Sequence, residues 1–281
     1  MSGAATFRAM GPDDVPSGLA LCRQSGWNQT EADWRLLLEP PSVFRVAEQQ
    51  GRVVGCAGAM VYGSELAWIC MVLVERSARG QGLGTGLVTE VLDGLPPVDA
   101  VGLDATPKGE SVYSRLGFVG TAALVRLEAT VSPATAPSGP RPITEADLPG
   151  LLARDRAVFG ADRGRILRRA LADAPEYAWC LGEGGDRAPA YCLGRHGVNG
   201  AQIGPVVASS PEAALDVTAA AVAGHTAPRL FLDAPAWGEW RSALEQRLGF
   251  HEQRPFTRMY RGPAPRSCPE QSYAVFGPEF G

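Results

Sequence analysis

The sequence is nearly devoid of lysine and has no excess of positive charge. Its 26 basic residues include a single lysine, Lys108, and the formal net charge is −4. Nucleic acids and anionic membranes attract proteins through basic surfaces, so we expect neither as a partner. A mildly acidic balance is compatible with a cationic, amine-bearing substrate.

Clustered metal ligands and long apolar runs are also missing, and we expect no secretory leader. The six cysteines form no Cys-x-x-Cys pair, and the three histidines are dispersed, whereas zinc sites need ligands at close spacing. No stretch approaches the roughly 18 apolar residues of a membrane helix, and the first ten residues lack a basic segment followed by an apolar run. We expect a cytoplasmic, metal-free protein with reduced thiols.

An internal repeat is the main feature that the sequence does have. Four short patterns recur in the same order at an offset of about 130 residues. The pairs are Arg8-x-Met10-x-x-x-Asp14-Val15-Pro16 with Arg141-x-Ile143-x-x-x-Asp147-Leu148-Pro149, Leu103-Asp104-Ala105 with Leu232-Asp233-Ala234, Leu116-Gly117-Phe118 with Leu248-Gly249-Phe250, and Arg126 with Arg258. The repeat predicts two similar domains, residues 1–131 and 141–281, joined by a Pro/Ser/Ala linker at 132–140.

Each half is predicted to be α/β, with a mixed central sheet flanked by helices. In the first half, the spacing of apolar residues and the positions of turn residues predict a succession of strands and helices. The expected strands are Phe7–Met10, Val43–Glu48, Val53–Val61, Leu66–Val74, Ala100–Ala105 and Val119–Ala129, and the expected helices run from Asp13 or Asp14 to Ser25, from Thr30 to Leu38, from Gly80 to Asp93 and from Gly109 to Leu116. The tail at 272–277 is expected to be a strand that docks onto the second sheet.

The segment from Met71 to Leu87 carries the most chemical information. An apolar strand leads through a short loop into the run Arg79-Gly80-Gln81-Gly82-Leu83-Gly84, which opens a helix. Glycines let backbone N–H groups approach an anion, and the helix N-terminus adds partial positive charge. The pattern predicts a pyrophosphate cradle, although it matches neither the nucleotide P-loop nor the dinucleotide fingerprint. A glycine-rich turn without a ligand is the alternative.

Two motifs together resemble the GNAT N-acetyltransferase superfamily. Arg79-x-x-Gly82-x-Gly84 is similar to its acyl-CoA signature, and Tyr113-Ser114-Arg115-Leu116-Gly117-Phe118 is similar to its Tyr-x-x-x-Gly-Phe motif. Further segments, including Gly277-Pro278-Glu279, resemble a bacterial subfamily with two such domains in tandem. The resemblance implies two strongly twisted GNAT-like sheets and acetyl-CoA as co-substrate.

The resemblance also implies roles for individual residues. Backbone groups of the strand hold the pantetheine arm, and N–H groups of the cradle hold the pyrophosphate; these residues are Val72, Leu73, Val74, Arg79, Gly80, Gln81, Gly82, Leu83, Gly84 and Thr85. Tyr113 protonates the departing thiolate as general acid, for which a phenol is suited because it starts protonated; a core aromatic is the alternative. Thr106 stands where many members have asparagine.

Other predicted site residues keep two interpretations each. Glu75 and Asp104 are the nearest acids that can serve as general base, or they are a loop acid and a helix-capping acid, with water relaying the proton. Trp27 and Asn28 either line the acceptor pocket or fill a buried hinge. The acids and arginines at 155–163 either face the acceptor cleft or form local salt bridges.

The second half has lost the cradle. At the shifted positions, Gly204-Pro205-Val206 replaces the pantetheine strand, Pro211 to Asp216 replaces the glycine run, and Glu245 replaces Tyr113. The sequence therefore predicts a degenerate second domain that binds no CoA. We expect an acyltransferase that moves an acetyl group to a primary amine of a small molecule or peptide by direct attack; the alternative is a non-catalytic acyl-CoA sensor or scaffold. The acceptor and the oligomeric state do not follow from the sequence.

Overall fold

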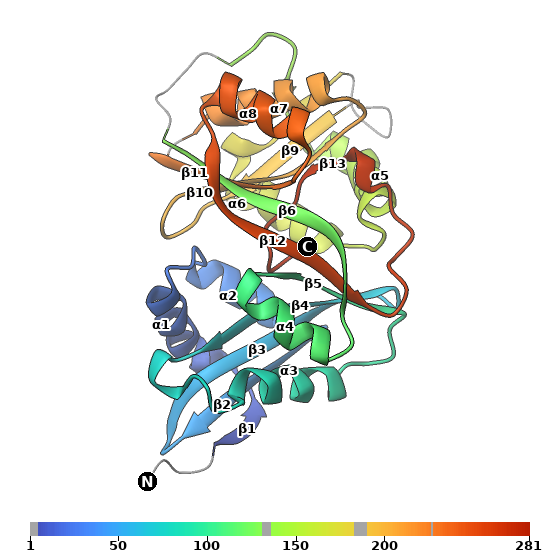
Figure 1. The fold of residues 1–281 in the computed structure, drawn as a ribbon. Helices are drawn as coiled ribbons and strands as arrows, with labels where there is room; N and C mark the ends of the chain where they lie inside the picture. Colours follow the sequence, from blue (N-terminus) through green and yellow to red (C-terminus); the bar gives the residue numbers. More distant parts are fainter. Residues whose placement is uncertain (1–4, 131–135, 183–189, 226) are drawn as a thin grey trace.

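The structure is a computed structural model that describes residues 5–130, 136–182, 190–225 and 227–281. The described strands form one mixed sheet, with helices packed against both halves of it (Figure 1). The predicted α/β fold is confirmed. Residues 132–135 of the predicted linker lie outside the described residues.

The first half follows the predicted order of elements. Its strands and helices are β1 (Thr6–Ala9), α1 (Val15–Ser25), α2 (Glu31–Leu38), β2 (Ser42–Gln49), β3 (Arg52–Tyr62), β4 (Leu66–Val74), α3 (Leu83–Asp93), β5 (Ala100–Ala105), α4 (Pro107–Arg115) and β6 (Val119–Thr130). Local sequence explains several boundaries. Thr30 accepts a hydrogen bond from the Asp33 amide (3.2 Å) to start α2, and Gly26, in the left-handed region, ends α1.

The second half repeats this order and ends with an additional short strand, β13. Its elements are β7 (Arg141–Pro142), α5 (Leu148–Phe159), α6 (Gly164–Asp173), β8 (Trp179–Leu181), β9 (Ala190–Arg195), β10 (Ala201–Ala208), α7 (Pro211–Ala223), β11 (Arg229–Pro235), α8 (Gly238–Leu248), β12 (His251–Arg261) and β13 (Ser272–Ala274). Short 3-10 turns precede or follow several of these helices and strands: η1 (Pro12–Asp14), η2 (Arg76–Ala78), η3 (Glu145–Asp147), η4 (Pro175–Tyr177) and η5 (Pro269–Gln271).

The two halves exchange their equivalent long strands. The order along the sheet is β1-β2-β3-β4-β5-β12-β6-β11-β10-β9-β8-β7, so β12 of the second half pairs with β5, and β6 of the first half pairs with β11. In Figure 1, β6 and β12 run side by side through the middle of the molecule. The sequence predicted Val119–Ala129 as the closing strands of the first sheet; in the structure this segment is one strand that joins the two sheets.

Reciprocal ion pairs accompany the exchange. Arg126 on β6 binds both carboxylate oxygens of Asp233 on β11, with both distances at 2.7 Å. Arg258 on β12 binds both oxygens of Asp104 on β5, with both distances at 2.9 Å. The recurring Leu-Asp-Ala patterns and the recurring arginines of the sequence thus bind each other across the halves.

The first repeated pattern has a local structural role. Arg8 binds Asp14, and Arg141 binds Asp147, each through both guanidinium NH groups. Asp147 also accepts a hydrogen bond from the Thr144 amide at 2.8 Å. Each pair therefore ties the first strand of a half to the turn that begins the next helix.

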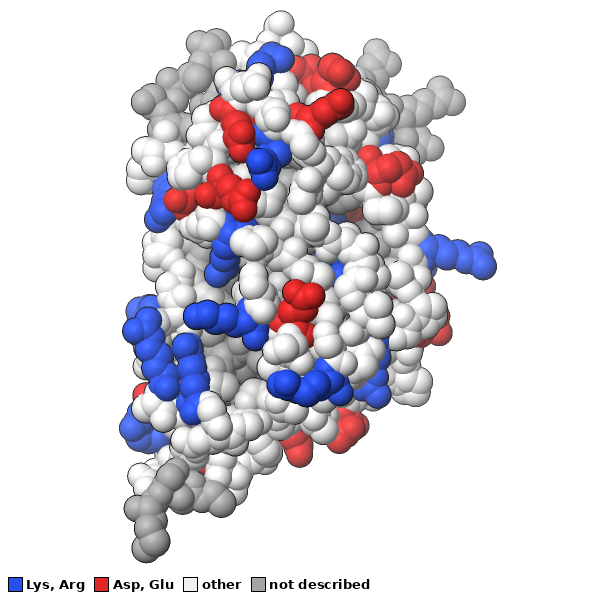
Figure 2. Space-filling model, viewed as in Figure 1, with Lys and Arg blue, Asp and Glu red and all other residues white. Residues whose placement is uncertain are grey.

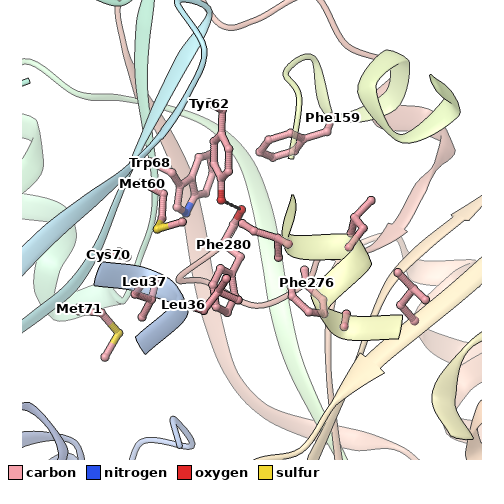
Figure 3. Close-up of a cluster of buried hydrophobic side chains, with 14 of the residues drawn as sticks. Leu36, Leu37, Met60, Tyr62, Trp68, Cys70, Met71, Phe159, Phe276 and Phe280 are labelled. Carbon is pink, nitrogen blue, oxygen red and sulfur yellow. Dashed lines mark hydrogen bonds between the residues drawn. The ribbon is translucent and has the colours of Figure 1, made fainter. Parts of the chain in front are cut away.

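The C-terminal segment packs between the halves. Phe276 and Phe280 are buried in a cluster with Leu37, Tyr62 and other first-half residues (Figure 3). The Tyr62 hydroxyl donates to the Phe280 carbonyl oxygen at 2.8 Å. The predicted docking of the tail is found in β13, which pairs with β10. The two halves consequently share one hydrophobic core.

Breaking one exchanged ion pair should destabilise the whole protein. Arg258→Gln leaves the Asp104 carboxylate, whose side chain is only 1% exposed, without its cation. We expect the free energy of unfolding, measured with urea, to fall by about 3–5 kcal/mol. Arg35→Gln, which breaks an exposed pair with Glu31, should change it by about 0.5 kcal/mol or less. Equal effects of the two variants would contradict this prediction.

Candidate functional site

The cavity of the first half opens where two parallel strands diverge. β4 pairs with β5 only from Leu66 to Trp68. Beyond that point the strands border a cavity of about 720 Å³, whose lining includes residues 69–74 of β4 together with Leu103 and Asp104 of β5. The predicted pantetheine strand, Val72, Leu73 and Val74, therefore has one edge free of strand pairing and directed at a cavity.

A β-bulge shapes this strand edge. Leu73 lies opposite Cys56 and Cys70 opposite Gly58, so β4 carries one extra residue there, and Met71 has φ +55°. A non-glycine residue in the left-handed region is uncommon. The Met71 carbonyl accepts a hydrogen bond from the Cys56 thiol at 3.2 Å. The bulge bends β4 at the point where it leaves β5, and no sequence signal marked it.

The glycine run contributes Arg79 and Gly84 to the lining of the same cavity, whereas residues 80–83 and Thr85 are not part of that lining. Gly80 and Gly82 have φ of +79° and +77°, and a Cβ atom at either would meet no atom within 4 Å. Backbone conformation, rather than lack of space, therefore requires glycine at these two positions. The predicted helix start at Gly80 is wrong, because α3 begins at Leu83 with Gly82 as its N-cap. At position 86 glycine is needed for lack of space, since a Cβ atom there would lie 2.6 Å from the Phe7 ring.

The N-terminus of α3 has no side-chain cap. Gly82 offers no hydrogen-bond acceptor to the first amides of the helix, so Leu83, Gly84 and Thr85 begin a turn whose N–H groups lack intrahelical partners. Arg79 donates its Nε–H to the Val74 carbonyl at 3.0 Å, which holds the guanidinium beside the cavity. Gln81 accepts from the Gln49 side chain at 3.1 Å. These groups form a positively polarised concave surface.

Further cations border this surface. Arg76 and Lys108 line the cavity with Arg79. In Figure 2, basic side chains gather around a hollow in the lower part of this face, over the first half of the chain. A group carrying several negative charges is the ligand that such a surface favours.

Tyr113 lies on α4 at the wall of the cavity. Its ring packs edge-on against Phe118, with 6.0 Å between ring centroids, and a Cβ at Gly109 would lie 2.9 Å from it. Its hydroxyl has no hydrogen-bond partner among the described residues. Burial, and secondarily the nearby Cys70 thiol, raises the pKa of Tyr113, so the phenol is a protonated donor at neutral pH. Thr106, the N-cap of α4, also lines the cavity.

The two predicted bases have different surroundings. Glu75 accepts a hydrogen bond from Arg52 at 3.2 Å and is not part of the cavity lining. Asp104 lines the cavity, but Arg258 occupies both of its oxygens. Burial raises the pKa of Asp104, and Arg258 opposes this shift.

Trp27 and Asn28 both line the cavity from the loop between α1 and α2. The Asn28 side chain donates to the Gly200 carbonyl at 2.9 Å and accepts from the Asn199 amide at 2.8 Å. Its amide group therefore ties this loop to the β9–β10 loop of the second half. Trp27 is partly buried and its carbonyl accepts from the Asn199 side chain at 2.9 Å.

The 155–163 cluster forms local ion pairs. Asp155 and Arg163 make a buried bidentate pair with both distances at 2.9 Å, and Asp162 accepts from the Gly164 amide at the start of α6. Arg156 binds Glu65 of the first half at 3.1 Å. The cavity lining contains none of these residues.

Residues that the sequence analysis did not assign complete the far end of the cavity. They come from the exchanged strands, the tail and the α1–α2 loop: Gln29, Arg126, Arg254, Phe256, Pro278 and Glu279. Glu279 was noted only as part of a motif. Its charge within an otherwise apolar tail was the available signal, because a buried charged residue needs a partner or a role.

The equivalent opening in the second half is filled. β10 pairs with β11 only from Ala201 to Ile203, as β4 does with β5. There β13 pairs with β10, and the Val275 amide donates to the Asp233 carbonyl at 2.9 Å. Gly204 permits this close approach, since its Cβ would lie 2.1 Å from the Val275 carbonyl oxygen.

The helix after this strand is also closed to anions. Ser210 caps α7 by accepting a hydrogen bond from the Ala213 amide at 3.2 Å, and Pro211 and Glu212 follow. At α7 the Ser210 side chain thus satisfies one first-turn amide, Pro211 supplies none, and the acid Glu212 stands beside them.

No helix in the described parts of the chain is long and apolar enough to cross a membrane. Within residues 5–130, 136–182, 190–225 and 227–281, no three His, Cys, Asp or Glu side chains gather as metal ligands would.

Comparisons with known proteins find acetyltransferase matches for both halves of the chain. The family model "Acetyltransferase (GNAT) family" matches residues 16–118, and "Acetyltransferase (GNAT) domain" matches residues 151–274. The uncharacterized N-acetyltransferase YitH of Bacillus subtilis is 28% identical over 260 residues, covering 90% of each chain.

Solved structures show the same fold. A putative acetyltransferase from Pyrococcus horikoshii superposes with a TM-score of 0.82 at 21% identity, covering 99% of this chain and 96% of that one. A tandem GNAT protein from the clavulanic acid biosynthesis pathway gives a TM-score of 0.64 at 15% identity, covering 92% and 99%.

Proposed function

The chain belongs to the GNAT superfamily as a tandem, two-domain acyltransferase, and on this basis we propose that it transfers an acetyl group from acetyl-CoA to a primary amine. One observation carries the proposal: the free edge of β4, Gly84 in the uncapped first turn of α3, and Tyr113 line a single cavity.

The chain's groups fit the parts of acetyl-CoA in order. Amides from Gly80 to Thr85, with Arg79, bind the pyrophosphate. The backbone of residues 72–74 binds the pantetheine arm as an added strand would, and an N–H of this strand polarises the thioester carbonyl. Acetyl-CoA supplies the activated acetyl group.

Tyr113 acts as general acid toward the thiolate that leaves. Its raised pKa keeps the proton on oxygen until sulfur gains charge. The amine gives its proton to water in the cavity, which relays it to bulk solvent; Asp104 lines the cavity but is not the direct acceptor, because Arg258 already occupies both of its oxygens. Trp27, Asn28 and Thr106 shape the walls around the acceptor.

We also propose the division into domains 1–131 and 141–281 around a linker at 132–140, and a second domain without CoA. The two family matches fall on either side of this linker. Occupation of the β10–β11 opening by the tail supports the second part.

Gly82→Glu should abolish the rise in melting temperature caused by acetyl-CoA. The added carboxylate would repel the pyrophosphate at the helix N-terminus. Gly249→Glu is the matched control, because Gly249 has a similar φ of +72° and an equally open Cβ position but lies far from the cradle. The cradle assignment fails if both variants keep the same shift.

Tyr113→Phe should leave acetyl-CoA binding unchanged and lower kcat by roughly 10²–10⁴-fold. Thiol release with an amine acceptor measures turnover, and calorimetry measures binding. Tyr273→Phe, which alters a buried ring packed on Trp240 in the second half, is the control and should keep full activity. Full activity of Tyr113→Phe would remove Tyr113 from the mechanism.

Calorimetric titration should give one CoA bound per chain. The tail fills the second opening, and the first turn of α7 is capped by Ser210 and carries Pro211 and Glu212 in place of glycines. A stoichiometry of two would refute the inert second domain, and the absence of any binding heat would refute the proposed function itself.

A further inference from the structure

The far end of the cavity, here called the acceptor end, is built by both halves of the chain. We define it by Gln29, Arg126, Arg254, Phe256 and Glu279. Arg126 and Arg254 lie directly opposite each other on the exchanged strands β6 and β12. Two like charges in such a cross-strand pair repel each other, so each needs a compensating anion.

Arg126 has its anion within the protein. Asp233 binds it through two hydrogen bonds, and only 6% of the Arg126 side chain is exposed. Arg258 is neutralised in the same way by Asp104. Arg195 is shared by two acids, Asp33 and Glu279.

Arg254 has no such partner. No hydrogen bond or ion pair joins it to any described residue, and its Nε atom is buried. Its guanidinium carbon lies 4.9 Å from the centre of the Phe256 ring. Burial, followed by repulsion from Arg126, lowers the pKa of Arg254 to about 10, which leaves it cationic at neutral pH.

Glu279 carries negative charge that is only partly paired, the opposite of the unpaired positive charge on Arg254. The side chain is 3% exposed; one oxygen accepts from Arg195, whereas Oε2 has no partner among the described residues. Gln29, which also lines the cavity, has an equally unpartnered Oε1. Two hydrogen-bond acceptors, one of them charged, suit the N–H groups of an amine.

The acceptor end therefore combines an unmatched cation with an unmatched acid. Arg126 and Arg258 are each paired with one acid, and Arg195 carries one positive charge against two acids, so the excess negative charge resides beside Glu279 and the excess positive charge on Arg254. A ligand with the reverse distribution would neutralise both. A single free guanidinium matches a monoanion such as carboxylate better than a phosphate dianion.

We propose that the acceptor is an aminocarboxylic acid, a small molecule with a primary amine and a carboxylate, whose carboxylate binds Arg254 and whose amine binds Glu279 and Gln29. The proposal rests on the proposed acetyl transfer to an amine. It assigns the second half, through β12 and the tail, the recognition of the acceptor.

Matched acceptor pairs test the proposal. Thiol release from acetyl-CoA is measured with α-, β- and γ-amino acids and with the corresponding decarboxylated amines and carboxamides. We expect kcat/KM to be at least about tenfold higher for the best carboxylate than for its matched neutral analogues, because a charged bidentate contact typically contributes more than 1.4 kcal/mol. Phosphoethanolamine and ethanolamine in the same panel distinguish a phosphate from a carboxylate.

Arg254→Gln should remove this preference while leaving the KM for acetyl-CoA unchanged. Arg261→Gln, an exposed arginine on the same strand, is the control and should retain the preference. Because no hydrogen bond or ion pair joins Arg254 to a described residue, Arg254→Gln should melt no lower than the parent; a lower melting temperature would indicate a structural role and overturn the assignment.

A binding measurement covers acceptors that are turned over slowly. In the presence of CoA, the carboxylate-bearing amines should raise the melting temperature of the parent protein and of Arg261→Gln, but not of Arg254→Gln. The proposal fails if neutral amines or phosphoethanolamine are preferred, if Arg254→Gln keeps the preference, or if no carboxylate-bearing amine binds. Acetyl-CoA binding and turnover of neutral amines would then still uphold the proposed function.

Discussion

The exchanged strands β6 and β12, locked by the ion pairs Arg126–Asp233 and Arg258–Asp104, are the constraint on which the rest of the structure depends. Removing charges from water is unfavourable, and bidentate geometry with two hydrogen bonds per pair offsets that loss. Each pair holds a strand of one half against the sheet of the other. Arg126 of β6 and Arg254 and Phe256 of β12 line the cavity, so part of the wall of the site depends on the exchange.

The sequence predicted the elements because they depend on local signals, and the proposed cradle was suggested by signals of the same kind. The Thr30–Asp33 cap, the apolar run at 66–74 and the glycines at 80–84 act within a few residues. The helix start was misplaced at Gly80 because glycines in left-handed loop positions resemble a helix opening in sequence. The exchange was not predictable: β6 and β12 are repeats of each other, so either segment suits either sheet. The interest of Arg254 and of the Glu279 Oε2 atom comes from the absence of a hydrogen-bond partner among the described residues, which the sequence cannot reveal.

The two halves show how one architecture is kept open or closed. Both contain a strand pair that diverges after three residues. In the first half the opening is bordered by a bulge at Met71 and by uncapped amides, which leaves hydrogen-bonding groups for a ligand. In the second half β13 takes the edge of β10, and Ser210 caps the helix. The tail then continues from Val275 to Glu279, which lies in the cavity of the first half.

The position of β12 between β5 and β6 also determines when the protein can become complete during synthesis. The ribosome delivers residues 1–130 long before residue 251, so β5 of a nascent chain has an unpaired edge until β12 emerges. Such an edge is prone to pair with other chains. The cavity itself lacks part of its wall until Glu279 has been added. The first half therefore completes neither its sheet nor its cavity until both β12 and Glu279 have been synthesised.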